Sequence, residues 1–212
     1  MVQLRHVAPQ DIESESFRII EAELGPHRLP PEEFQIARRM IHATGDFSFA
    51  ENARFHPRAV AAGLAAIRAG KNVLVDVRMA AAGISAALLA RHGGRVICRM
   101  NEPETAELAR KLGGTRAEAA MRRSADSPAD NVGIVAVGNA PTALLAVMDL
   151  IAANRFAPDL VIGVPVGFVN AAESKELLAE KDYPHITVLG RKGGTPVAVA
   201  AVNALLRLAE KK

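Results

Sequence analysis

The apolar residues near the N-terminus recur at helical spacing. They predict one helix over residues 9–23 and a second helix that begins at Pro30-Pro31 and ends before Gly45. Proline is favoured in the first turn of a helix, and glycine is favoured just past its end. Two N-terminal helices are therefore expected.

From about residue 57, helical stretches alternate with short β-branched runs. The predicted strands are NVLVDV (72–77), RVICRM (95–100), VGIVAV (132–137), DLVIGV (159–164) and HITVL (185–189). Predicted helices flank them at 58–69, 85–92, 103–112, 115–123, 142–153, 171–180 and 195–210. This alternation predicts an α/β fold with a mostly parallel, doubly wound sheet and helices on both faces. Because no linker-like stretch interrupts it, residues 1–212 are expected to form a single domain.

Each predicted strand ends in polar or glycine-rich sequence. These ends read DVRM, RMNE, VGNAPT, GVPVGF and LGRKGG. Ligands of open α/β sheets bind beyond the carboxyl ends of the strands. Glycines there allow close backbone approach, and helix N-termini offer free N–H groups to anions. The sequence therefore predicts a broad ligand cleft along this edge.

Composition narrows the classes of function. Half of the residues are hydrophobic and 23% are charged, which predicts a globular protein with a sizeable core. The net charge of +3 is scattered, and aromatic residues make up 4%, so no nucleic-acid partner is expected. A single cysteine, Cys98, excludes an internal disulfide and fits a reducing compartment. The N-terminal stretch MVQLRHVAPQDIESES lacks a signal-peptide core, and no uncharged apolar run is long enough for a bilayer. A cytoplasmic protein without a membrane partner is predicted.

Several cofactor and catalytic motifs are absent from the sequence. It contains no G-x-x-x-x-G-K-[ST], G-x-G-x-x-G or G-x-S-x-G stretch, and its six histidines lack metal-binding pair spacing. Cys98 lies within a predicted strand, so we expect an inert thiol. Ser174 and Lys175 are neighbours that point about 100° apart on a helix, which disfavours a Ser/Lys hydrolase. Chemistry without a metal or cofactor is the remaining hypothesis.

His42 is the natural candidate for acid–base chemistry. It lies at the end of the second predicted helix, within one turn of Arg38 and Arg39. The arginines disfavour the imidazolium form, whereas the helix C-terminus favours it. A histidine that merely caps or cross-links the helix end is the alternative, and this pattern alone leaves both open.

Seven stretches, in this order, resemble the precorrin-8X methylmutase family of the vitamin B12 pathway: ESFRIIEAE, RRMIHATGD, LVDVRMAAAGI, GGTRAEAAM, AVGNAPTAL, GVPVGFVNAAESKELL and GRKGGTPVAVAAVNALL. The resemblance extends from about residue 12 to 207. It implies a homodimer that moves a methyl group from C-11 to C-12 of the corrinoid ring. The product would be hydrogenobyrinate, or its cobalt-containing counterpart.

The resemblance also implies roles for individual residues. His42 of the R-x-x-H motif would be the proton donor and acceptor, and Ser16 and Arg39 would bind substrate. Arg116 matches a family arginine, but Ala117 follows it where serine is usual. The alanine side chain cannot make any contact of that serine hydroxyl.

A macrocycle fringed with carboxylates needs an apolar floor and a cationic or N–H-rich rim. The rim candidates are Arg39, Arg116, Lys175, Arg191 and Lys192, with the GNAPT and GRKGG backbones, including Gly193 and Gly194. Asn139 and Thr142 are expected either to bind substrate or to cap the following helix. Asp46 and Asp76 are candidates for orienting His42 or an arginine.

The sequence leaves two alternative functions open. A corrinoid carrier would bind the substrate without converting it. An S-adenosylmethionine methyltransferase would fit the methyl chemistry, but the sequence lacks a glycine loop followed by an acidic strand end.

Overall fold

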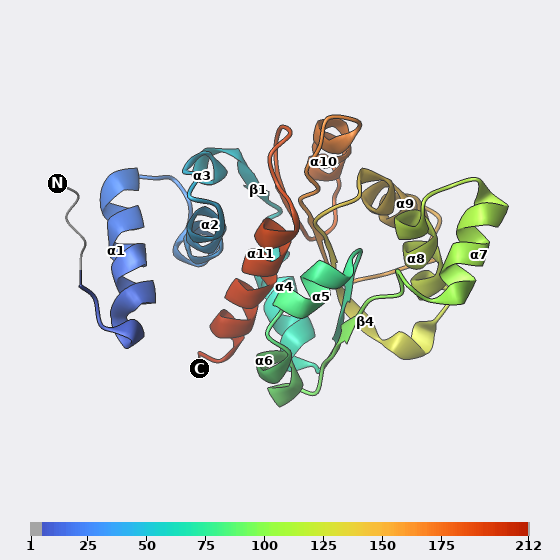
Figure 1. Ribbon diagram of the computed structural model, residues 1–212, viewed down its shortest axis with the longest axis horizontal. Coiled ribbons are helices and arrows are strands. Elements are labelled where there is room, and N and C mark those ends of the chain that lie inside the picture. The colour runs from blue at the N-terminus through green and yellow to red at the C-terminus, as the bar shows by residue number, and fades with distance from the viewer. Residues whose placement is uncertain (1–5, 212) are drawn as a thin grey trace.

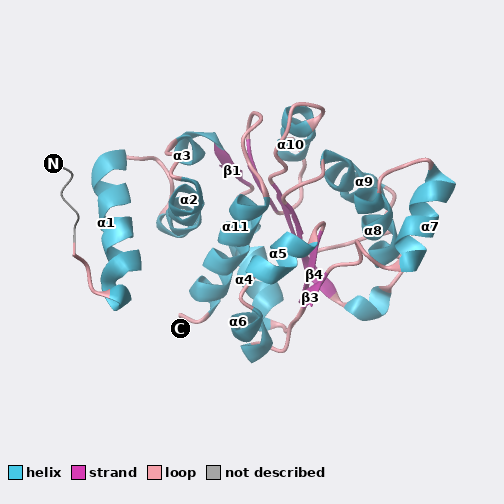
Figure 2. Ribbon diagram, viewed as in Figure 1, coloured by secondary structure: helices cyan, strands magenta, loops and turns pink. Residues whose placement is uncertain are grey.

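A computed structural model describes residues 6–211, which form one six-stranded sheet between two groups of helices (Figures 1 and 2). The strands are β1 (Ala53–Phe55), β2 (Asn72–Val75), β3 (Val96–Ile97), β4 (Val132–Val137), β5 (Leu160–Gly163) and β6 (His185–Val188). Their order across the sheet is β1-β6-β5-β4-β2-β3. Only β1, on β6, is antiparallel within the described chain. The mostly parallel sheet predicted from the sequence is confirmed.

The two faces of the sheet carry different helices. The helices are α1 (Ile12–Leu24), α2 (Pro31–Thr44), α3 (Ser48–Asn52), α4 (Ala59–Arg68), α5 (Arg78–Gly83), α6 (Ala86–Arg91), α7 (Pro103–Leu112), α8 (Arg116–Ala125), α9 (Pro141–Ala152), α10 (Ala171–Ala179) and α11 (Thr195–Ala209). Helices α2, α4 and α11 pack on one face, and α8, α9 and α10 on the other.

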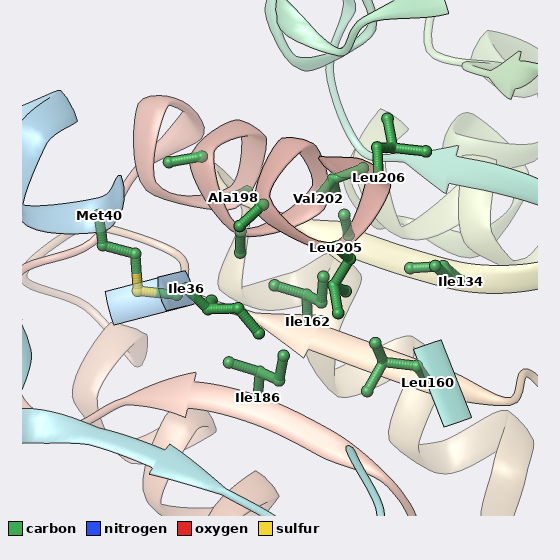
Figure 3. Packing of buried hydrophobic residues seen from close by; sticks show 14 of the residues in the cluster. Ile36, Met40, Ile134, Leu160, Ile162, Ile186, Ala198, Val202, Leu205 and Leu206 are labelled. Carbon is green, nitrogen blue, oxygen red and sulfur yellow. The ribbon is translucent and has the colours of Figure 1, made fainter. Parts of the chain in front are cut away.

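Alternating strand residues build the two halves of the core. In β4, Ile134 and Ala136 face α11, whereas Val135 and Val137 face α8 and α9. Figure 3 shows Ile134 and the strand isoleucines beneath the apolar side of α11. Both faces are covered, which explains why the strands are continuous apolar runs.

The strand order creates a topological switch point. The chain passes from β2 outward to β3 and then returns to the other side of β2 to form β4. The carboxyl ends of β2 and β4 are therefore neighbours from which connections leave in opposite directions. Ligands of doubly wound sheets bind in the crevice at such a point.

The N-terminal helices extend the molecule beyond the sheet. Figure 1 shows α1 at one end of the molecule, beside α2. Helix α2 begins with Pro31 and ends at Thr44. Gly45 follows in the left-handed conformation (φ 66°), and its N–H donates to the Ile41 carbonyl at 2.7 Å. Both predicted helices are confirmed. In the described part of the chain, no helix has the length and apolarity to cross a membrane.

Three short elements, α3, β1 and α5, were not predicted. The predicted strand 95–100 is also wrong beyond Val96–Ile97, because this edge strand pairs with β2 alone. Cys98 therefore lies just after the strand, half-buried, and burial raises the pKa of its thiol. A protonated thiol is a poor nucleophile, consistent with the predicted inert cysteine.

Candidate active site

A buried carboxylate joins the two strands at the switch point. Asp76 follows β2 and is fully buried. It accepts backbone N–H bonds from Gly138 at 3.1 Å, Asn139 at 2.8 Å and Ala140 at 2.8 Å. Burial raises the pKa of this carboxyl, and the three N–H groups oppose the rise. The prediction that Asp76 orients His42 or an arginine is wrong, because it fixes the turn between β4 and α9.

The β4–α9 turn brings together three predicted site residues. Asn139 is exposed on the turn, and the Thr142 hydroxyl lies 2.8 Å from that of Thr115. Thr115 also accepts the Glu118 N–H at the start of α8, which places Arg116 on the surface beside it. The structure thus brings Asn139, Thr142 and Arg116 to the switch point.

The expected capping role of Asn139 and Thr142 is wrong. Helix α9 begins after Ala140 without a side-chain cap, because Asp76 from another strand takes the N–H groups before it. Ala117, the residue after Arg116 in α8, has its side chain buried in the core.

The β6–α11 turn is packed backbone against backbone. Gly193 has φ +157°, and a Cβ placed there would lie 2.3 Å from the Val164 carbonyl oxygen. The Gly194 N–H donates to the same carbonyl at 2.8 Å. Only glycine fits at residue 193, so the GRKGG sequence sets how closely this turn crosses the end of β5.

Lys175 lies beneath this turn and not on an exposed rim. Its side chain is fully buried, and its ammonium donates to the Lys192 carbonyl at 2.6 Å. The predicted placement of Lys175 among the rim cations is therefore wrong. Sequence spacing gave no signal of this contact, which joins residues 17 positions apart.

Large apolar side chains are exposed along the same edge. Met79 follows β2, and Val166, Phe168 and Val169 follow β5; their exposed fractions are 67%, 47%, 84% and 78%. The Arg191 guanidinium lies 5.5 Å from the centre of the Phe168 ring. An apolar floor with a cation beside it is what a carboxylate-fringed macrocycle requires.

His42 lies in the last turn of α2 with its side chain exposed. It lines a cavity of about 280 Å³ that also includes Ser16, Gly45 and Phe47. The edge of its imidazole meets the Phe17 ring, with centroids 5.3 Å apart. The structure therefore brings His42 and Ser16 to one cavity, as the proposed site requires.

Ion pairs to α1 neutralise the two arginines beside His42. Arg38 pairs with Glu21, and its guanidinium lies 4.1 Å from the centre of the Phe17 ring. Arg39 donates to both carboxylate oxygens of Glu13 at 3.0 and 3.1 Å. The side chain predicted to bind substrate thus already has a bidentate carboxylate partner, which sequence analysis did not identify.

A surface ion pair links this helical region to the sheet edge. Asp46, just after α2, accepts a hydrogen bond from the Lys192 ammonium at 2.6 Å. The Lys192 ammonium and the Ser48 hydroxyl lower the pKa of Asp46 to about 2. The prediction that Asp46 orients His42 or an arginine is therefore wrong, because its partner is a lysine from the β6–α11 turn.

The candidate site is broad. Strands β6 and β2 are three positions apart, which corresponds to about 14 Å at the usual spacing. The Asp46–Lys192 pair ties the segment after His42 to the β6–α11 turn, and Arg116 begins α8 beside the β4–α9 turn. Within residues 6–211, no group of three or more His, Cys, Asp or Glu side chains is arranged to hold a metal ion.

The comparisons with known proteins agree on one family. The precorrin-8X methylmutase family model matches residues 11–208. The cobalt-precorrin-8 methylmutase of Priestia megaterium is 48% identical over 204 residues, which covers 96% of this chain and 90% of that protein. The precorrin-8X methylmutase of Pseudomonas aeruginosa is 42% identical over 198 residues, covering 92% and 94%.

A solved structure has the same fold. The crystal structure of precorrin-8X methylmutase from Thermus thermophilus aligns with a TM-score of 0.86 and 46% sequence identity, covering 94% of this chain and 96% of that one. Sequence and structure therefore show that this chain belongs to the precorrin-8X methylmutase family.

Proposed function

We propose that this protein is an isomerase of cobalamin biosynthesis that moves a methyl group from C-11 to C-12 of precorrin-8X or its cobalt form. The observation that carries the proposal is the exposed imidazole of His42 in one cavity with Ser16, in a chain whose family match covers residues 11–208. Substrate and product are isomers, so the step needs no oxidant, reductant or group donor.

His42 acts as the proton donor and acceptor in this proposal. A proton, or a strong hydrogen bond, delivered to a ring nitrogen near the migrating carbon polarises the conjugated system. The bond from the methyl group to C-11 then breaks as the bond to C-12 forms, and the proton returns to the imidazole. A positioned general acid of this kind contributes roughly 10²–10⁴-fold to the rate.

The sheet edge supplies the binding surface. Met79, Val166 and Phe168 offer an apolar floor, and Arg116 and Arg191 flank it as cations for the peripheral carboxylates. The expectation that the GNAPT backbone donates to the ligand is wrong for Gly138, Asn139 and Ala140, because Asp76 takes these N–H groups. Asn139 and Thr142 lie where they would meet the same ligand.

We also propose that the protein works as a homodimer in the cytoplasm, without a nucleic-acid partner. The exposed apolar residues at the sheet edge leave one side of a large ligand uncovered in a single chain. A second copy would close that side. Sedimentation of the purified protein tests the oligomeric state directly.

Absorption spectroscopy tests the activity. Purified protein is incubated with precorrin-8X and, in a parallel reaction, with cobalt-precorrin-8, because relatives of both names are similar to this chain. Conversion to the product chromophore supports an isomerase, and the faster reaction identifies the preferred substrate. Tight binding without a spectral change would support a carrier. Added S-adenosylmethionine should leave turnover unchanged; acceleration by it would contradict an intramolecular methyl shift.

A further inference from the structure

Lys175 carries a buried charge that the proposed chemistry does not use. Its side chain is among the largest of the fully buried ones, and within residues 6–211 its ammonium makes one hydrogen bond, to the Lys192 carbonyl. No carboxylate of the described chain forms an ion pair with it. Burial alone lowers the pKa of this lysine to about 8.

A lysine in this position is unfavourable for the fold. Removing an ammonium from water costs free energy, and one carbonyl partner offsets only part of it. An apolar side chain of similar length at a buried charged position is often neutral or stabilising. Stability therefore gives little reason for a lysine here, and its hydrogen bond to the Lys192 carbonyl is the remaining reason.

The hydrogen bond fixes a turn that faces the candidate site. Lys192 lies between Arg191 and Gly193, and the Arg191 carbonyl accepts the Gly167 N–H at 3.2 Å. The β6–α11 turn is thus tied to the loop that carries Phe168, whose ring lies beside the Arg191 guanidinium. Holding the Lys192 carbonyl inward directs the neighbouring side chains outward.

Lys192 also contacts the segment that follows α2, the helix that carries His42. While the Lys192 carbonyl accepts from Lys175, its side chain pairs with Asp46, four positions after His42. One turn therefore connects the apolar floor, the cationic rim and the segment that follows the imidazole.

We propose that Lys175 is a positioning residue, whose ammonium holds the turn of residues 190–194 so that Arg191 faces the ligand and Lys192 reaches Asp46. Its effect on ligand binding rests on the proposed corrinoid function. Its effect on the turn does not, and the two are measured separately.

The test compares Lys175→Met with Lys181→Met, an exposed lysine just past the end of α10. Lys175→Met should unfold in urea at or above the wild-type midpoint. Amide hydrogen exchange should accelerate at Gly167 and Gly194, which bond across the turn, and stay unchanged in β4. Product affinity should fall and KM should rise, each roughly tenfold or more, as expected for the loss of one charge-assisted hydrogen bond. The change in kcat should be smaller. Lys181→Met should match the wild type throughout.

Several results would overturn the proposal. Wild-type exchange rates in the turn, or wild-type affinity for product, would show that the ammonium positions nothing. A general loss of stability with faster exchange in β4 would make Lys175 a residue of the fold. If the wild-type protein neither binds nor converts a corrinoid, the proposed function fails, whereas the exchange rates still decide whether Lys175 holds the turn.

Discussion

Around His42, partly exposed ion pairs join α1 to α2, whereas at the sheet edge two buried charged side chains bond to backbone groups. Glu13 and Glu21 pair with the arginines next to His42, and such pairs near water contribute about 0–1 kcal/mol each. Asp76 and Lys175 are fully buried; Asp76 accepts N–H bonds from the β4–α9 turn, and Lys175 donates to a carbonyl of the β6–α11 turn.

The two regions should therefore respond differently to substitution. Substitution of His42 should alter turnover with little effect on the free energy of unfolding, because the His42 side chain is exposed. A change at the buried charges should alter stability, the geometry of the turns, or both. Single substitutions in the two regions should separate these effects.

His42→Ala should lose turnover by roughly 10²–10⁴-fold, the contribution of a positioned general acid. The imidazole is exposed, so the urea midpoint should stay close to the wild-type value, and the product should still bind. Steady-state turnover, an absorption titration and urea unfolding measure the three quantities. His27→Ala, an exposed histidine on the loop before α2, is the matched control. Near-wild-type turnover in His42→Ala would remove the histidine from the mechanism.

Asp76→Asn should lower the free energy of unfolding by about 3 kcal/mol. The carboxylate accepts three backbone N–H bonds, and an amide group turns one of its two acceptor atoms into a donor that faces them. Urea unfolding measures the loss, and Asp149→Asn on the exposed side of α9 is its control. A stability change like that of the control would show that the turn keeps its shape without the carboxylate.

Lys175→Met should stabilise the fold, whereas Asp76→Asn destabilises it, and the size of the stabilisation should depend on pH. The pKa of Lys175 is about 8 in the folded chain and 10.5 without burial, so the unfolded state binds more protons between these values. Wild-type stability should therefore rise, relative to Lys175→Met, as the pH increases from about 8 to 10.5. At pH 7 the variant should be the more stable, by at most about 3 kcal/mol. A difference that is independent of pH across this window would mean that the amine is not desolvated.

Elements that depend on local sequence patterns were predicted, whereas elements that depend on contacts between distant residues were not. Helices and parallel strands are encoded by local periodicity, so α1, α2 and the strand ends were predicted. β1 has three residues and α5 has six, and neither contains the β-branched run or the apolar helical stripe from which the other elements were predicted. Their formation depends on neighbours distant in sequence, as in the antiparallel pairing of β1 with β6.

The same limit applied to the candidate site. The motifs identified His42 and Ser16, and the structure brings the two to one cavity. The sequence did not predict the partners of the charged residues, because these contacts join distant positions: Arg39 with Glu13, Asp76 with the turn after β4, and Lys175 with Lys192. Whether a lysine lies on a rim or beneath it is decided by such contacts.

The Asp46–Lys192 pair, where the two regions meet, should give the smallest effect. Asp46→Asn should lower the free energy of unfolding by about 0.2–1 kcal/mol, the usual value for a surface pair, and by less in high salt. Because the pKa of Asp46 is lowered to about 2, the contribution is complete above pH 3.8 and is lost as the pH falls toward 2. Urea unfolding of wild type and variant between pH 7 and 3 measures the gap.

Lys192→Met and the double variant complete a double-mutant cycle for this pair. If the pair acts only through stability, product affinity should be unchanged in Asp46→Asn. If it aligns the His42 segment with the turn that Lys175 holds, turnover should fall while the urea midpoint barely moves. A loss above about 2 kcal/mol would contradict the assignment as a surface pair. Asp46 would then belong with the buried charged residues, and the division between the two regions would lie at the C-terminal end of α2.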